Sequence, residues 1–136
     1  MNKDYIMRMI EEFIKGLAAI IMQRKTKQFV DAKLNLDGLS LQVTGFGLEQ
    51  LKSLGAEGIK YVFSKDKDSE NEKIYLAARM LKGEGLIFES EGNLEESSKS
   101  FALSKELFEL VSDSDYPERN QAMEELEELR IIKQIK

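Results

Sequence analysis

A single proline, Pro117, occurs in the 136 residues, and this scarcity constrains the fold more than any other feature of the sequence. Proline inside a helix removes a hydrogen bond and costs about 3 kcal/mol, so long stretches without it favour helices. Large apolar residues recur at spacings of three and four along most of the chain, which is the period of an amphipathic helix. We therefore predict one all-α domain over residues 1–136, a compact array of about five to seven helices.

Residues 4–25 are expected to form the first helix. Two apolar stripes run along this segment, so its apolar face is wider than that of an ordinary surface helix. A face this wide lies at the centre of the core or is buried against a partner, and a second copy of the chain is one candidate. We predict an interface formed by four residues of the first stripe, which are Ile6, Ile10, Phe13 and Leu17.

The same segment lacks the pattern of a signal peptide or a membrane-spanning helix. Its most apolar run covers only residues 17–22, and Asp4, Glu11 and Glu12 precede that run. A spanning helix requires about 20 mostly apolar residues. We therefore expect the segment to belong to the mature fold and the protein to be cytoplasmic. Binding of helix 4–25 to an anionic membrane surface is the alternative.

Residues 33–43 fit two structures. Val30, Leu34 and Leu41 lie on one face of a helix, whereas the alternation of apolar and polar residues around Asp37-Gly38 is typical of a β-hairpin. A lone hairpin is only marginally stable, and no other segment has a strand pattern. We therefore favour a helix and keep the hairpin as the alternative.

Glycines and polar residues divide the rest of the domain. The segment Thr44-Gly45-Phe46-Gly47 is expected to end one helix, because Gly45 tolerates a left-handed backbone. Gly55 is expected to separate the two short helices that follow. A polar loop over residues 64–71 then divides the N-terminal helices, 1–63, from the remaining part, 71–136.

The C-terminal part is expected to begin with two helices joined by a tight turn. The pattern Ser69-x-x-Glu72 predicts a capping box before a helix over 71–90. Gly92 then provides the stop and Asn93 the cap of the partner helix over 94–111. Pro117 is expected in the first turn of a last helix that runs to near the C-terminus.

Residues 81–108 resemble a tetratricopeptide repeat, in which a small residue of the first helix lets the second helix pack closely. Gly85 stands at the small position and Gly92 in the turn, whereas Ser97 and Ser104 replace the usual alanines and Glu109 the closing proline. One visible repeat implies a single helical hairpin with a groove for peptides or partner helices, and not a solenoid. The residues that carry this packing are Leu81, Gly85, Phe88, Gly92, Ser97, Phe101 and Ser104.

The whole chain is also similar to a small bacterial family of uncharacterised helical proteins. The similarity lies in the opening Asp4-Tyr5-Ile6-Met7-Arg8-Met9-Ile10 and in Thr44-Gly45-Phe46-Gly47-Leu48-x-x-Leu51. It implies the helical fold and a bacterial cytoplasmic location, and it implies no activity.

The composition narrows the chemistry that the chain offers. There is no cysteine and no histidine, which excludes thiolate and imidazole chemistry. The pairs Gly45-Phe46-Gly47 and Gly83-Glu84-Gly85 lack the strand and helix context of a phosphate loop. A net charge of −5 gives no general attraction to nucleic acid. We therefore predict no catalytic residue, cofactor or metal site, and no nucleic-acid partner.

The function expected from these patterns is non-enzymatic. We expect a protein that binds a protein partner or itself as a homo-oligomer. The alternatives are binding to a membrane surface, as given above, and a small-molecule or metal site formed by carboxylates between helices. Glu84 with Glu91 and Glu89 with Glu95 are the pairs that such a site would use.

Overall fold

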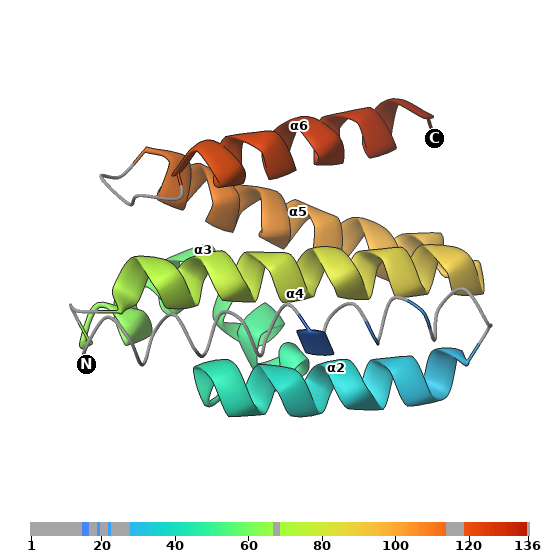
Figure 1. Cartoon of the computed structure of the whole chain (residues 1–136), viewed down its shortest axis with the longest axis horizontal. Coiled ribbons are helices and arrows are strands. Elements are labelled where there is room, and N and C mark those ends of the chain that lie inside the picture. The colour runs from blue at the N-terminus through green and yellow to red at the C-terminus, as the bar shows by residue number, and fades with distance from the viewer. Residues whose placement is uncertain are drawn as a thin grey trace.

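The computed structural model describes residues 15, 16, 19, 22, 28–66, 69–113 and 119–135. In that part of the chain it contains five α-helices and no strand (Figure 1). This confirms the all-α prediction, and residues 33–43 are helical and do not form a hairpin. The helices are α2 (Phe29–Thr44), α3 (Leu48–Phe63), α4 (Glu70–Glu91), α5 (Leu94–Ser112) and α6 (Arg119–Ile135).

Figure 1 shows α2, α4, α5 and α6 stacked one beside the next. The α4–α5 pair makes the most extensive contact, and α3 packs against both of these helices. A helix that contacts neighbours on several sides is apolar around most of its circumference, and α4 has this property. Its buried apolar side chains are Ile74, Tyr75, Leu76, Ala77, Ala78, Met80, Leu81 and Ile87. We conclude that α4 is the central helix of the described core.

Only part of the predicted first helix lies among the described residues. Lys15, Gly16, Ala19 and Met22 have helical backbones. A Cβ atom on Gly16 would lie 3.4 Å from Cδ1 of Leu39, so this stretch lies against α2. The rest of the predicted helix 4–25 is outside the described residues.

A polar joint connects α2 to α3. Gly45 has φ 84° and ends α2, as its sequence context predicts. The Asp37 Oδ1 atom accepts a hydrogen bond from the Leu48 amide at 2.9 Å, which satisfies one of the free N–H groups at the start of α3. Gly47 leaves room for this contact, because a Cβ atom there would lie 2.9 Å from Asp37 Oδ1 and would displace the carboxylate. The Gly47 amide in turn donates to Gln50 Oε1 at 2.8 Å.

The helix break predicted at Gly55 and the capping box predicted at Ser69 have different outcomes. Gly55 interrupts α3 with φ 69° and ψ 176°, which confirms a break between two short helices. The capping box predicted at Ser69 is wrong, because its capping hydrogen bond is not formed. Ser69 stands at the N-cap of α4, but its side chain makes no capping bond. Its backbone, at φ −131° and ψ 14°, is not in the extended conformation that directs an N-cap oxygen to the first-turn amides.

The Asp37 contact can be tested by substitution. Asp37→Ala leaves the Leu48 amide without its acceptor, and we expect the free energy of unfolding to fall by about 1 kcal/mol. Asp37→Asn keeps an acceptor oxygen and should retain most of the stability. Urea denaturation gives the measurement, with Gln42→Ala on the exposed side of α2 as a control that shifts it by less than about 0.5 kcal/mol. Equal stability of Asp37→Ala and the control would contradict the capping role.

Candidate functional site

The α4–α5 hairpin packs closely at the position predicted to be small. A Cβ atom on Gly85 would lie 2.5 Å from Cε1 of the Phe101 ring, a distance that real side chains do not adopt. Leu81, one turn earlier, is fully buried. Gly85 therefore has the packing role that the sequence predicts, with Phe101 as the side chain that fills the space.

Serines of α5 satisfy their hydroxyl groups on α4. Ser97 Oγ donates to the Gly85 carbonyl at 3.0 Å, and Ser104 Oγ donates to the Ala78 carbonyl at 2.7 Å. Both serines are fully buried. A serine is nearly as small as the alanine that the repeat pattern usually has, and its hydroxyl is compatible with burial because it is hydrogen-bonded. The two departures from the pattern therefore preserve close packing.

The turn between the two helices has the predicted chemistry. Gly92 has φ 89° and its amide donates to the Glu89 carbonyl at 3.0 Å. Asn93 Oδ1 accepts from the Glu96 amide at 3.3 Å and so caps α5. This confirms Gly92 as the stop of one helix and Asn93 as the cap of the next.

Phe88 lies between two lysines from other helices. The Nζ atoms of Lys33 on α2 and Lys52 on α3 are 5.3 Å and 5.4 Å from the centre of its ring. Lys33 also pairs with Glu91 at 2.9 Å. The aromatic residue predicted for the hairpin therefore contacts α2 and α3 through its ring face, where cations are attracted to the π electrons.

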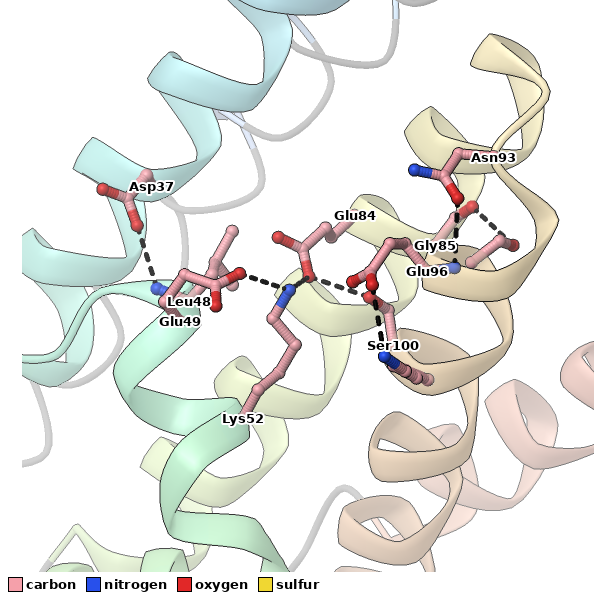
Figure 2. A network of polar contacts seen from close by, with 11 residues as sticks. Asp37, Leu48, Glu49, Lys52, Glu84, Gly85, Asn93, Glu96 and Ser100 are labelled. Atoms are coloured by element: carbon pink, nitrogen blue, oxygen red, sulfur yellow. Dashed lines mark hydrogen bonds and ion pairs between the residues drawn. The ribbon is translucent and has the colours of Figure 1, made fainter.

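A buried ion pair joins α3 to the hairpin. Figure 2 shows Lys52 reaching from α3 to Glu84 on α4, with a separation of 3.0 Å between Nζ and Oε1. Glu84 is only 5% exposed, and it also accepts a 2.8 Å hydrogen bond from Ser100 on α5. Glu49 provides a second carboxylate, 2.9 Å from Lys52 Nζ. This network was not predicted, because Glu84 is one of many glutamates in a charged chain and its sequence neighbours do not mark it as buried.

The surrounding charges decide the protonation of Lys52. Burial by itself would lower the pKa of the Lys52 ammonium, but the neighbouring Glu49 and Glu84 carboxylates outweigh burial and raise the pKa above its ordinary value of 10.5. Lys52 is therefore charged throughout the physiological range. The site is an ion pair with a permanent cation.

The carboxylates considered for a ligand site have other partners. Glu84 is held by Lys52 and Ser100, and Glu91 by Lys33. Among the residues that the structure describes, no three acidic, histidine or cysteine side chains form a group that could hold a metal ion. Glu84 and Glu91 therefore join helices through these contacts.

The outer face of α2 exposes large apolar side chains. Val30 and Leu34 are each 66% exposed and Leu41 is 49% exposed. These three residues share the helical face predicted from the sequence, and that face points to solvent. The opposite side of α2 is buried through Ala32, Leu36, Ser40 and Val43.

An open groove of about 630 Å³ runs beside this face. Among the described residues, its lining contains no charged side chain, although 33% of the residues in the chain are charged. Gly16, Ala19 and Gly38 leave space in it, and a Cβ atom on Gly38 would meet nothing within 4 Å. Its lining residues are Gly16, Ala19, Leu34, Asn35, Gly38, Leu39 and Gln42.

The predicted interface residues Ile6, Ile10, Phe13 and Leu17 lie outside the described residues, so their role stays a prediction. The same holds for the proposed contact of helix 4–25 with a membrane surface. Among the described helices, none has the length and apolar character needed to cross a membrane.

Comparison of the chain with models of protein families, with curated proteins and with solved structures finds no match. The similarity to a bacterial family therefore stays a prediction. What is established is a small all-helical protein with five helices in its described part and antiparallel packing.

Replacing Gly85 and Gly38 by alanine is predicted to have opposite effects on stability, because packing restricts the first position and only helix propensity acts at the second. Gly85→Ala should destabilise the protein by about 1–3 kcal/mol, because the added methyl group meets the Phe101 ring. Gly38→Ala, the matched control in open space on α2, should stabilise it by about 0.5–1 kcal/mol. Thermal and urea unfolding give both values.

Removing the ring tests the cause. In a Phe101→Ala background, Gly85→Ala should cost at least about 0.5 kcal/mol less than it does alone. Strictly additive effects of the two substitutions would show that Phe101 is not the obstacle.

The ion pair predicts a specific alkaline transition. Because the folded-state pKa of Lys52 is raised, its stabilising contribution is complete below the unfolded-state value of 10.5 and is lost as pH rises through the folded-state pKa. The difference in free energy of unfolding between wild type and Lys52→Met should therefore be constant between pH 7 and 10 and change in sign or size above that range. A difference that stays constant up to pH 12 would rule out this coupling.

Proposed function

We propose that this chain is a non-enzymatic protein-interaction protein that binds a partner protein, or a second copy of itself, through the outer face of α2. The observation that supports this proposal is the row formed by Val30, Leu34 and Leu41, large apolar side chains exposed on one face beside a groove whose described lining is uncharged. Single exposed apolar residues are ordinary, but a contiguous apolar surface is typical of an interface.

The groove favours a helix as the bound element. Its glycine and alanine residues would allow the backbone of a partner helix to approach closely, while Leu34 and Leu39 provide apolar contact on either side. Asn35 and Gln42 are neutral donors and acceptors that fix orientation without the desolvation of a charge. The surface therefore suits the apolar side of an amphipathic helix.

The α4–α5 hairpin contacts α2 through α4. Lys33 on α2 pairs with Glu91 at the end of α4 and lies over the Phe88 ring. In this proposal the tetratricopeptide-like hairpin is the scaffold and α2 carries the binding surface, which differs from the groove that the resemblance alone implies. The cytoplasm remains the location in which we expect this interaction.

The area of the surface sets a further requirement. A stable interface buries roughly 800 Å² on each partner, which is more than three side chains expose. We therefore propose that Ile6, Ile10, Phe13 and Leu17 extend the surface, since Gly16 and Ala19 of the same segment line the groove.

A charge placed in the row of Val30, Leu34 and Leu41 tests the proposed interface. Leu34→Glu should weaken association about 30-fold or more, because a glutamate in the contact would be desolvated without a partner. Met123→Glu, at a similarly exposed apolar residue on α6, is the matched control and should leave association unchanged. Light scattering on purified protein reports self-association, and capture of tagged protein from cells followed by mass spectrometry reports other partners.

The outcomes distinguish the two kinds of partner. A dimer lost in Leu34→Glu alone identifies self-association, and a specific captured protein lost in the same variant identifies a heterologous partner. Association or capture that Leu34→Glu and Met123→Glu affect equally would refute the role of α2.

A further inference from the structure

Gly38 stands in the middle of α2, at an exposed position of the helix. It does not have the left-handed backbone of Gly45, Gly55 and Gly92, so its conformation does not call for a glycine. A Cβ atom on it would meet nothing within 4 Å, so packing in the described part of the chain does not call for one either. Glycine in a helix interior costs about 1 kcal/mol relative to alanine. The described contacts of the single chain do not account for this cost.

The neighbours of Gly38 on the same face are large and apolar. Leu34 lies one turn before it and Leu41 one turn after it, and both side chains are exposed. A small residue between two large ones is typical of the point where two helices cross closely. Gly85 shows such a place filled within the fold, since the Phe101 ring of α5 lies where its Cβ atom would be. At Gly38 the corresponding space is open.

The exposed part of this face carries no charge. Only two charged residues occur between positions 32 and 45, and both have partners within the fold. Lys33 pairs with Glu91, and Asp37 accepts from the Leu48 amide. Two copies of a chain with a net charge of −5 repel each other over most orientations. This face lets two copies approach without bringing exposed like charges together. Its exposed residues are Leu34, Asn35, Gly38, Leu41 and Gln42.

The same face is complementary to its own reverse. Leu34 precedes Gly38 by four residues, and Leu41 follows it by three. When a second α2 runs antiparallel and the two copies of Gly38 meet, Leu34 of each copy lies beside Leu41 of the other. A two-fold symmetric contact requires this property, because the same patch must fit itself. Binding of a different protein requires no symmetry about Gly38.

From these observations we infer that the partner of α2 is a second copy of the chain, and that the two α2 helices cross antiparallel at Gly38. The inference rests on the binding role proposed for α2 and names its occupant. Figure 1 shows α2 at one edge of the stack of labelled helices. One helix from each copy gives a contact at the low end of interface sizes, below about 1,200 Å² in total, so the dimer is reversible.

Replacing Gly38 by leucine distinguishes a close crossing from general apolar adhesion. The side chain at position 38 enters open space, so the single chain should remain folded, which circular dichroism checks. Gly38→Leu adds apolar surface and would strengthen unspecific adhesion, whereas it holds two crossing helices apart. We expect it to weaken dimerisation about tenfold or more in sedimentation equilibrium. Ala102→Leu, the matched control at an exposed position of α5, should leave dimerisation unchanged.

Cross-linking tests the orientation, since the chain has no cysteine of its own. A mixture of Leu34→Cys and Leu41→Cys proteins should form a disulfide-linked dimer in a glutathione buffer. Leu34→Cys alone should not, because antiparallel pairing at Gly38 separates the two copies of residue 34 by about 12 Å along the helix axis. A disulfide requires Cα atoms within about 7 Å. Met123→Cys on α6 is the control for random collision.

The inference is overturned if the wild-type protein stays monomeric up to millimolar concentration, or if Gly38→Leu dimerises as strongly as Ala102→Leu. It is also overturned if Leu34→Cys alone cross-links as well as the mixture, which would indicate parallel helices. A monomeric protein that captures another protein, and loses it in Leu34→Glu, would exclude the second copy and leave the proposed function intact. A dimer that neither Leu34→Glu nor Gly38→Leu affects would refute both.

Discussion

The helices α4 and α5 approach each other closely because residue 85 is glycine and has no side chain. Only a hydrogen at that position leaves room for the Phe101 ring, and only small residues such as Ser97 and Ser104 fit where the two backbones are nearest. Since their hydroxyls bond to carbonyls of α4, the interface is close without leaving polar groups unsatisfied. The position of α4 against α5 then determines which of its other side chains are buried.

One consequence is the burial of Glu84. A carboxylate with so little exposure requires a cation and hydrogen-bond donors, and α3 supplies Lys52 while α5 supplies Ser100. Because Lys52 must reach Glu84, the position of α3 is restricted, and the Asp37 contact with the Leu48 amide ties α2 to the start of the same helix. A single buried charge thus links α3, α4 and α5, while the separate Asp37 contact adds α2, and the role of the charge is to select one arrangement more than to add stability.

The helices and their ends were predictable because they depend on local patterns. Apolar spacing located α4 and α5, and Gly45, Gly55 and Gly92 marked the breaks through their backbone conformations. The network around Glu84 was not predictable, since no local pattern says which glutamate of a charged chain is buried. Asp37 has a local pattern typical of a hairpin, yet its partner is eleven residues away. The burial of Glu84 and the partner of Asp37 are decided by contacts between helices, and local sequence patterns do not show which helices meet.

The same limit applies to the candidate binding surface. The pattern of Val30, Leu34 and Leu41 correctly indicated one helical face, but α2 has apolar residues on two faces and periodicity does not distinguish the inner one. Burial of Leu36 settles the orientation and leaves the other face exposed. The exposed residues Val30, Leu34 and Leu41 lie outside the described core, which α2 joins through its inner face. An exposed apolar face makes association with another apolar surface favourable, and this is the basis of our proposal that α2 binds a partner.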